Sequence, residues 1–218
     1  MSMRIDVVLP CLNEADAMPA VINDLPAGFD ALVVDNGSTD GSPQIAAGLG
    51  ARVVHERRRG YGAAVHTGLR EATTDLVAFL DADGSIDAAA LTGLAAVVAG
   101  GHADLAVGRR VPVDRSVQPW HARTGNAALA ALLRHRGAPV HDIAPIRVGE
   151  RLRLLELDIT DRAFGYPLEL LLNAAKAGWL IHEVDVPYRA RAGGRSKVSG
   201  SVGGTLRAVR DMAKVACR

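Results

Sequence analysis

The sequence predicts an α/β protein in which a mostly parallel sheet is wound by helices on both faces. Three observations support this prediction. Short apolar segments alternate with stretches of helical periodicity through the first half of the chain. Residues 76–80 are apolar at every position, as in a strand buried on both faces of a parallel sheet. Polar loops follow the first, second and fourth apolar segments, where the carboxyl ends of parallel strands would meet at one edge.

Composition limits the classes of protein that this chain can be. Its 218 residues are 49% hydrophobic, so we expect residues 1–218 to form a single domain with a full core. A formal net charge of +1 gives no indication of nucleic-acid binding. Two cysteines are too few for a disulfide framework, and no apolar run reaches the length of about 18 residues that spans a membrane. A cytoplasmic protein is therefore expected, and the oligomeric state is not predicted.

The first half of the chain carries the clearest alternation of strands and helices. Five predicted strands lie at residues 5–9, 31–34, 52–55, 76–80 and 104–107. Pro10 is expected to close the first strand, because proline cannot donate a backbone hydrogen bond. Between strands, apolar residues recur with the spacing of a helix that buries one face, as in residues 18–25. Another helix is predicted from Asp87 to about Val98.

The second half continues with a different pattern. Arg109 and Arg110 are expected to end the fifth strand, and 141–147 to be a loop that enters another strand. Helices are predicted at 120–136 and 167–177, a strand at 180–186, and a last helix from about 202. In that last helix one face carries Leu206, Val209, Met212 and Ala213, and another carries Arg207, Arg210, Lys214 and Arg218.

Two aspartates directly follow the buried strand at 76–80. Asp81 and Asp83 stand two residues apart, which in extended backbone puts both carboxylates on one side, and Gly84 allows a sharp turn. Mg²⁺ and Mn²⁺ take oxygen ligands, and a site with one or two carboxylates usually leaves the other positions to substrate phosphates and water. The pattern therefore favours a metal shared with a phosphorylated ligand.

A strand-ending turn is the alternative interpretation of Asp81 to Gly84, with Asp87 capping the next helix. The other polar loops decide between the two interpretations. Residues 10–14, 35–38 and 81–85 all follow predicted parallel strands, so they should converge at one edge of the sheet. That convergence favours a ligand site.

The ordered motifs resemble the inverting glycosyltransferases of family 2, which have the GT-A fold. The first half matches four landmarks of that family: VVLPCLNEAD, VVDNGSTDGS, RGYGAAVHTGL and LVAFLDADGS. The second half is similar to the polyprenyl-phosphate sugar synthases of the dolichyl-phosphate mannose synthase type, through HDIAPIR, GYPLEL, EVDVPYRAR and GGRSK. The resemblance covers nearly the whole chain. It implies a metal-dependent enzyme that transfers a hexose from a UDP- or GDP-sugar to a polyprenyl phosphate.

The resemblance implies that residues 1–108 bind the nucleotide-sugar donor. The nucleoside pocket would be lined by Pro10, Leu12, Glu14 and Asp35. Carboxylates suit this role because they accept hydrogen bonds from ribose hydroxyls or a base N–H. An Asx turn with the two residues that follow is the alternative for Asp35.

The resemblance also assigns the metal ligands. Asp81 would face the ribose and the metal, and Asp83 would bind the metal, either Mg²⁺ or Mn²⁺. Ser85 occupies a position where relatives often carry a glutamine as a further ligand.

Residues 109–218 would form the acceptor side. Arg109, Arg110 and Arg123 look like the family's acceptor-phosphate cluster, and Asp142 sits where the family places a catalytic or acceptor-side aspartate. A hydroxyl acceptor needs such a base, whereas a phosphate acceptor is already anionic. The chain departs from the family pattern at 144–146, where relatives often have Ser-Gly-Phe.

Two basic segments complete the resemblance. Arg195 and Lys197 lie on a glycine-rich loop suited to close over the diphosphate and exclude water. The basic last helix either rests on an anionic membrane surface or is the solvent-facing side of an ordinary helix. Peripheral membrane contact is thus one of two open interpretations.

Three other functions are alternatives to this one. Transfer to a soluble hydroxyl acceptor keeps the same donor chemistry. A nucleotidylyltransferase would want a glycine-rich basic loop after the first strand, where this chain has Leu-Pro-Cys-Leu-Asn-Glu at 9–14. A non-catalytic nucleotide-binding module would bind UDP or GDP without transferring anything.

Overall fold

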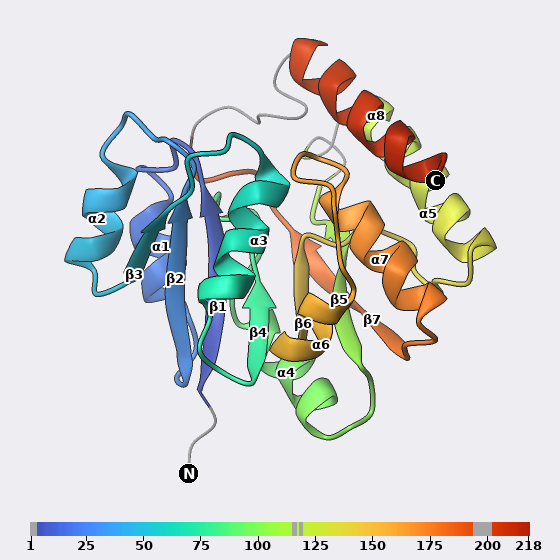
Figure 1. The fold of residues 1–218 in the computed structure, drawn as a ribbon. Helices are drawn as coiled ribbons and strands as arrows, with labels where there is room; N and C mark the ends of the chain where they lie inside the picture. Colours follow the sequence, from blue (N-terminus) through green and yellow to red (C-terminus); the bar gives the residue numbers. More distant parts are fainter. Residues whose placement is uncertain (1–3, 115–116, 118–119, 194–201) are drawn as a thin grey trace.

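A computed structural model describes residues 4–114, 117, 120–193 and 202–218. Its centre is a seven-stranded sheet in the order β3-β2-β1-β4-β6-β5-β7 (Figure 1). The strands are β1 (Ile5–Cys11), β2 (Phe29–Asp35), β3 (Arg52–His55), β4 (Leu76–Phe79), β5 (Leu105–Pro112), β6 (Ile146–Glu150) and β7 (Ile181–Tyr188). Neighbouring strands are parallel except at β6, which runs antiparallel to both β4 and β5. The predicted α/β class with a mostly parallel sheet is confirmed.

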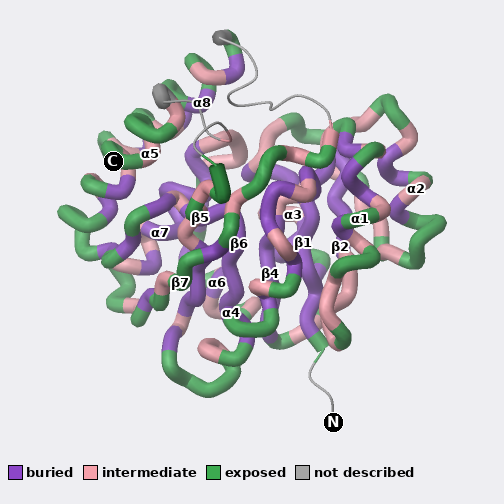
Figure 2. The backbone as a smooth tube through the Cα atoms, turned by 180° about the vertical axis from the view of Figure 1, so that it is seen from behind, coloured by how far each residue is buried: buried purple, intermediate pink, exposed green. Residues whose placement is uncertain are grey.

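Helices cover both faces of the sheet. They are α1 (Met18–Asn23), α2 (Ser42–Gly48), α3 (Tyr61–Glu71), α4 (Ala90–Ala99), α5 (Trp120–His135), α6 (Arg151–Glu156), α7 (Tyr166–Lys176) and α8 (Val202–Ala216). Each face has its own hydrophobic core. Val8 packs in the core beneath α3 and α7, while its neighbours Val7 and Leu9 pack in the core beneath α1 and α4. The central strands are accordingly buried (Figure 2).

Strand β1 does not end at Pro10, so that prediction is wrong. The strand continues to Cys11, with Pro10 paired against Val34 of β2. Residues 8 and 10 of a parallel strand direct their backbone groups to the same neighbour, which here is β4. Val8 accepts a hydrogen bond from Leu80, and β4 has ended by the level of Pro10. Leu80 lies opposite Leu9, so its carbonyl would have accepted an N–H at position 10, and the pairing of β1 with β4 accordingly ends at Val8 and Phe79.

Strand β5 also runs further than predicted. Arg109 and Arg110 lie inside it, because β7 offers a paired residue at every position from Leu105 to Pro112. The short helix α6 was not predicted at all, since six residues carry too little periodicity to recognise.

The last helix, α8, buries a face that matches the predicted apolar face only at Met212, which packs partly buried against the core. The buried positions are Gly204, Ala208, Asp211 and Val215. Leu206 and Val209 are exposed. The small residues allow α8 to approach α7 closely. At Gly165, just before α7, an added Cβ would lie 2.6 Å from Val215 Cγ2. Within the described ranges, no helix is long and apolar enough to cross a bilayer.

Candidate active site at the carboxyl edge of the sheet

The acidic turn after β4 lies at the centre of the site. Tyr61, at the start of α3, donates a hydrogen bond from its hydroxyl to Asp81 Oδ1 at 3.1 Å. Asp83 Oδ1 accepts the backbone N–H of Ser85 at 2.9 Å, and Gly84 has φ +70°. The turn weighed as an alternative is therefore present. It uses one oxygen of Asp83 and none of Asp81, so it coexists with a ligand site.

The Asp81 carboxyl is electrostatically perturbed. Burial, and then the charge of Asp83, raise its pKa to about 6, against the opposing effects of Arg147 and Arg110. Two carboxylates this close repel one another in their ionised forms. A cation between them would relieve the repulsion, which is the electrostatic condition for a divalent metal site.

A cationic side chain already lies against this acidic group. Arg191 follows β7, and its Nη2 lies 2.7 and 2.9 Å from the two carboxylate oxygens of Glu14, with Nη1 3.1 Å from Asp83 Oδ2. The next residue is also fixed in place, because the N–H of Ala192 donates to the carbonyl of Asp83 at 3.0 Å. Glu14 and Asp83 therefore suit a positive group by their observed contacts. Among the described residues, no cluster of three or more acidic, histidine or cysteine side chains could hold a metal.

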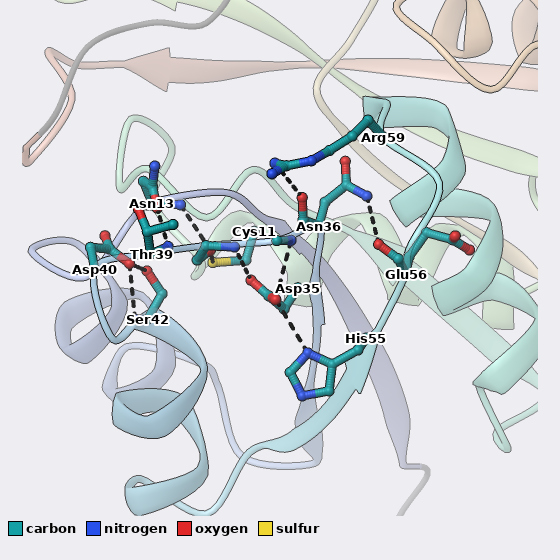
Figure 3. A network of polar contacts seen from close by, with 12 residues as sticks. Cys11, Asn13, Asp35, Asn36, Thr39, Asp40, Ser42, His55, Glu56 and Arg59 are labelled. Atoms are coloured by element: carbon teal, nitrogen blue, oxygen red, sulfur yellow. Dashed lines mark hydrogen bonds and ion pairs between the residues drawn. The ribbon is translucent and has the colours of Figure 1, made fainter.

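The loops after β1 and β2 form the neighbouring part of the site (Figure 3). Asp35 is buried at the end of β2 and accepts N–H bonds from Ser38 at 2.9 Å and Gly37 at 3.2 Å, and it contacts His55 Nδ1 at 3.2 Å. Burial alone would raise the pKa of Asp35, but the bonds from Ser38, His55 and Gly37 outweigh it and lower the pKa. The Asx turn proposed as an alternative for Asp35 is thus present.

Hydrogen bonds connect these two loops. Asn13 Oδ1 accepts the N–H of Thr39 at 2.8 Å, and Ser42 Oγ accepts the N–H of Glu14 at 2.9 Å. Asp40 accepts the N–H of Ala15 at 3.0 Å. Glu14 is thereby fixed on a rigid backbone, with the half-buried Pro10 and Leu12 just before it.

Two of the predicted acceptor-side arginines, Arg109 and Arg110, do not lie together. Arg109 and Arg110 are successive residues of β5, so their side chains point to opposite faces of the sheet. Arg109 makes a two-fold contact with Asp185 of β7 at 2.6 and 2.7 Å. Arg123 is exposed on α5. Of the two strand arginines, Arg110 is the one that pairs with Asp142.

Arg110 and Asp142 form a buried ion pair. Nε and Nη2 of Arg110 donate to the two carboxylate oxygens at 2.8 and 2.7 Å, and the backbone N–H of Arg110 adds a third bond at 2.9 Å. Burial would raise the pKa of Asp142, but Arg110 outweighs it and lowers the pKa. The guanidinium also lies 5.5 Å from the centre of the Tyr188 ring. Arg110 is therefore held rigidly, and Asp142 is held ionised.

Comparison with known proteins gives the family. Residues 6–157 match the model of Glycosyl transferase family 2. The chain belongs to glycosyltransferase family 2. An uncharacterized glycosyltransferase of Mycobacterium tuberculosis (strain ATCC 25618 / H37Rv) is 54% identical over 212 residues, 97% of each chain. A dolichyl-phosphate hexose transferase of Haloferax volcanii is 32% identical over 203 residues, 91% of this chain and 88% of that one.

Solved structures give the fold of this glycosyltransferase. Glucosyl-3-phosphoglycerate synthase from Mycobacterium tuberculosis, in complex with Mn²⁺, uridine diphosphate and glucosyl-3-phosphoglycerate, aligns with a TM-score of 0.75. The alignment covers 99% of this chain and 80% of that one at 22% identity. The expected GT-A fold is confirmed.

Sequence reasoning missed two arginines of this glycosyltransferase. Arg191 belongs to the basic segment after β7, but we singled out Arg195 and Lys197 there, which lie outside the described residues. Arg147 of β6 is buried beside Asp81, and its Nη2 donates to the carbonyl of Ile143 at 2.8 Å. In the described part of the chain, its Nε and Nη1 have no hydrogen-bond partner. The only sequence signal for Arg147 was its place at the end of HDIAPIR.

Proposed function

We propose that this glycosyltransferase is a metal-dependent inverting enzyme that transfers a hexose from a UDP- or GDP-sugar to a polyprenyl phosphate. The observation that carries the proposal is the pair Asp81 and Asp83 at the tip of β4, where a half-buried carboxyl with a raised pKa adjoins a second, buried carboxyl. The polyprenyl-phosphate acceptor is supported by the relative named as a dolichyl-phosphate hexose transferase, which aligns over nearly the whole chain.

The donor would bind to residues 1–108. Pro10, Leu12, Glu14 and Asp35 would line the nucleoside pocket, where hydrogen bonds between the segments that follow β1 and β2 hold the backbone in place. Asp81, Asp83 and Ser85 would hold Mg²⁺ or Mn²⁺. When bound, the ion would supply positive charge to the diphosphate, which becomes more negative as it leaves.

The acceptor oxygen would attack the anomeric carbon on the side opposite the diphosphate, forming one C–O bond as the other breaks. Arg191 is placed to help the leaving group, because its guanidinium would exchange two carboxylates for phosphate oxygens without leaving the site. Arg195 and Lys197 would close over the same diphosphate and exclude water.

The state of Asp142 favours a phosphate acceptor. A carboxylate whose pKa is lowered by a bidentate arginine is a weak base, so it would deprotonate a hydroxyl poorly. A phosphate monoester needs positive charge rather than a base. We assign that charge to Arg110 with Arg123, and place Arg109 at the outer margin because Asp185 holds it on the other face.

A soluble hydroxyl acceptor is the second candidate, supported by the position of a buried aspartate, Asp142, beside the predicted acceptor arginines. The non-catalytic nucleotide-binding module is the third. Substituting Asp142→Asn separates the first two, because it removes the basic carboxylate while keeping the side-chain shape and one of the two oxygens that Arg110 contacts. Near-total loss of turnover with retained donor binding indicates a general base, whereas a modest loss indicates a phosphate acceptor.

A direct test measures transfer of labelled hexose from UDP- and GDP-sugars to a short-chain polyprenyl phosphate, with Mn²⁺ or with excess chelator. We expect product only with metal, and none from Asp81→Ala or Asp83→Ala. Full turnover of these variants in chelator would contradict the metal-dependent mechanism. Melting temperatures with UDP, GDP and their sugars would identify the donor base, because a ligand bound by the native form raises the melting temperature.

A further inference from the structure

The exposed side of α8 has an unusual distribution of side chains. Leu206 and Val209 are 64% and 59% exposed, and with the exposed Ala213 they recur at i, i+3 and i+7. They lie opposite the buried Gly204, Ala208, Asp211 and Val215. Among the described residues, α8 thus presents Leu206 and Val209 to solvent, while Ala208 and Val215 are buried and Met212 packs partly buried against the core. Nothing in the packing of α8 against α7 uses these two side chains.

A row of cations runs beside this apolar stripe. Arg207, Arg210 and Lys214 are exposed and recur with the same spacing, one residue further along the helix. Within the described part of the chain, Arg207 and Lys214 make no ion pair or hydrogen bond through their side chains. The acidic residue of α8, Asp211, is buried and accepts hydrogen bonds from Arg210 at 3.1 and 3.3 Å. The exposed charge of the helix is therefore entirely positive.

The position of α8 relates this surface to the active site. Figure 1 places α8 at the end of the molecule toward which the arrowheads of β1 and β2 point, which is the edge that carries Asp35 and Asp81. Strand β5 is parallel to those strands, and Val113, just beyond its carboxyl end, is 60% exposed. Exposed aliphatic side chains and the catalytic edge thus occupy the same end of the molecule.

We infer that α8 is an interfacial helix that docks the enzyme on an anionic lipid bilayer. Leu206 and Val209 would enter the boundary between headgroups and acyl chains, while Arg207 and Lys214 reach the lipid phosphates from the flank of the helix. Charge complementarity selects this occupant, because a narrow apolar stripe flanked by unpaired cations matches an anionic, apolar interface. The inference rests on the proposed function in one respect: a polyprenyl phosphate is presented from such a surface.

The test is co-sedimentation of the full chain with phosphatidylcholine vesicles, with and without phosphatidylglycerol. We expect binding that requires phosphatidylglycerol and weakens as salt is added. Substituting Leu206→Ser and Val209→Ser together should lower the partition coefficient by roughly tenfold or more. Substituting Arg207→Gln and Lys214→Gln should lower it by about fivefold for each charge.

The matched control is Leu180→Ser, which changes a leucine that is 60% exposed at the other end of the sheet, before β7. It should bind vesicles like the unsubstituted chain. All variants change exposed side chains, so their melting temperatures should be unaltered. Equal vesicle binding by all variants would overturn the inference. It would also be overturned if the unsubstituted chain bound no vesicles but formed a dimer that the Leu206→Ser and Val209→Ser substitutions dissociate.

A second measurement separates this inference from the proposed function. Transfer to a short-chain polyprenyl phosphate in detergent should be the same for the double variant and the unsubstituted chain. If the unsubstituted chain binds vesicles but transfers no hexose, the proposed function fails and the docking surface stands. If it transfers hexose but does not bind vesicles, the docking surface fails alone.

Discussion

Substituting Asp81→Asn should stabilise the metal-free protein while abolishing its activity. The pKa of Asp81 is raised from 3.8 to about 6 because the ionised form is buried beside Asp83. A shift of about two pKa units corresponds to about 3 kcal/mol at pH 7, and the solvent contact that the side chain retains reduces the expected gain to about 1–2 kcal/mol. For a chain of this length, that gain raises the melting temperature by about 3–6 °C.

The pH dependence of this gain follows from the direction of the shift. The folded protein holds the Asp81 proton to a higher pH than the unfolded chain, so ionisation destabilises the fold fully above about pH 6. Below about pH 4 the carboxyl is protonated in both states. The stability difference between Asp81→Asn and the unsubstituted protein should therefore be largest at neutral pH and vanish on acidification.

Chemical denaturation in chelator at pH 7 and pH 4 measures the effect, and hexose transfer with Mn²⁺ measures the expected loss of turnover, about 100-fold or more. Asp83→Asn is the matched control. It loses a metal ligand too, but its carboxylate accepts bonds from Ser85 and Arg191, so no stabilisation is expected. A variant Asp81→Asn that is no more stable at pH 7, or equally stabilised at pH 4, would refute the reasoning.

Three further predictions concern single contacts. Arg191→Ala removes the guanidinium from Glu14 and Asp83, so this variant should bind Mn²⁺ more tightly in the absence of donor, while its turnover falls. Calorimetry measures the Mn²⁺ affinity, and weaker binding would contradict the prediction. Arg110→Lys loses the bidentate contact with Asp142, so it should lower the free energy of unfolding by about 1–3 kcal/mol. In steady-state kinetics it should raise KM for the acceptor and leave KM for the donor unchanged. Gly62→Ala places a Cβ within 2.9 Å of a backbone carbonyl, so urea denaturation should show a loss of about 1–3 kcal/mol, and an unchanged midpoint would refute the packing argument.

Local chemistry was predictable from the sequence. The apolar run at 76–80 followed by Asp81, Asp83 and Gly84 determined a strand and its turn, because both depend on residues adjacent in the chain. The convergence of the loops after β1, β2 and β4 followed from parallel strands sharing one carboxyl edge.

Features that depend on distant partners were not predictable. Glu14 and Arg191 are 177 residues apart, and nothing in either segment identifies the other. Helical periodicity defines the faces of α8 but does not say which face its neighbour α7 can accept, so the small residues that pack there went unnoticed. Likewise Pro10 lies inside β1 because β2 continues to pair with the strand beyond the level where β4 ends.

The reversed direction of β6 has a consequence for how acceptor preference can diversify. Because β6 is antiparallel to β4 and β5, the loop that precedes it, with Asp142, lies at the edge of the sheet where the carboxyl ends of β4 and β5 lie. Ala138, Val140 and Ala144 of that loop are buried in the core that also holds Val8 and α3, whereas Gly137, Pro139 and His141 are exposed. Under the proposed function, the exposed positions are therefore those at which substitution would change the surroundings of Asp142 without disturbing the core.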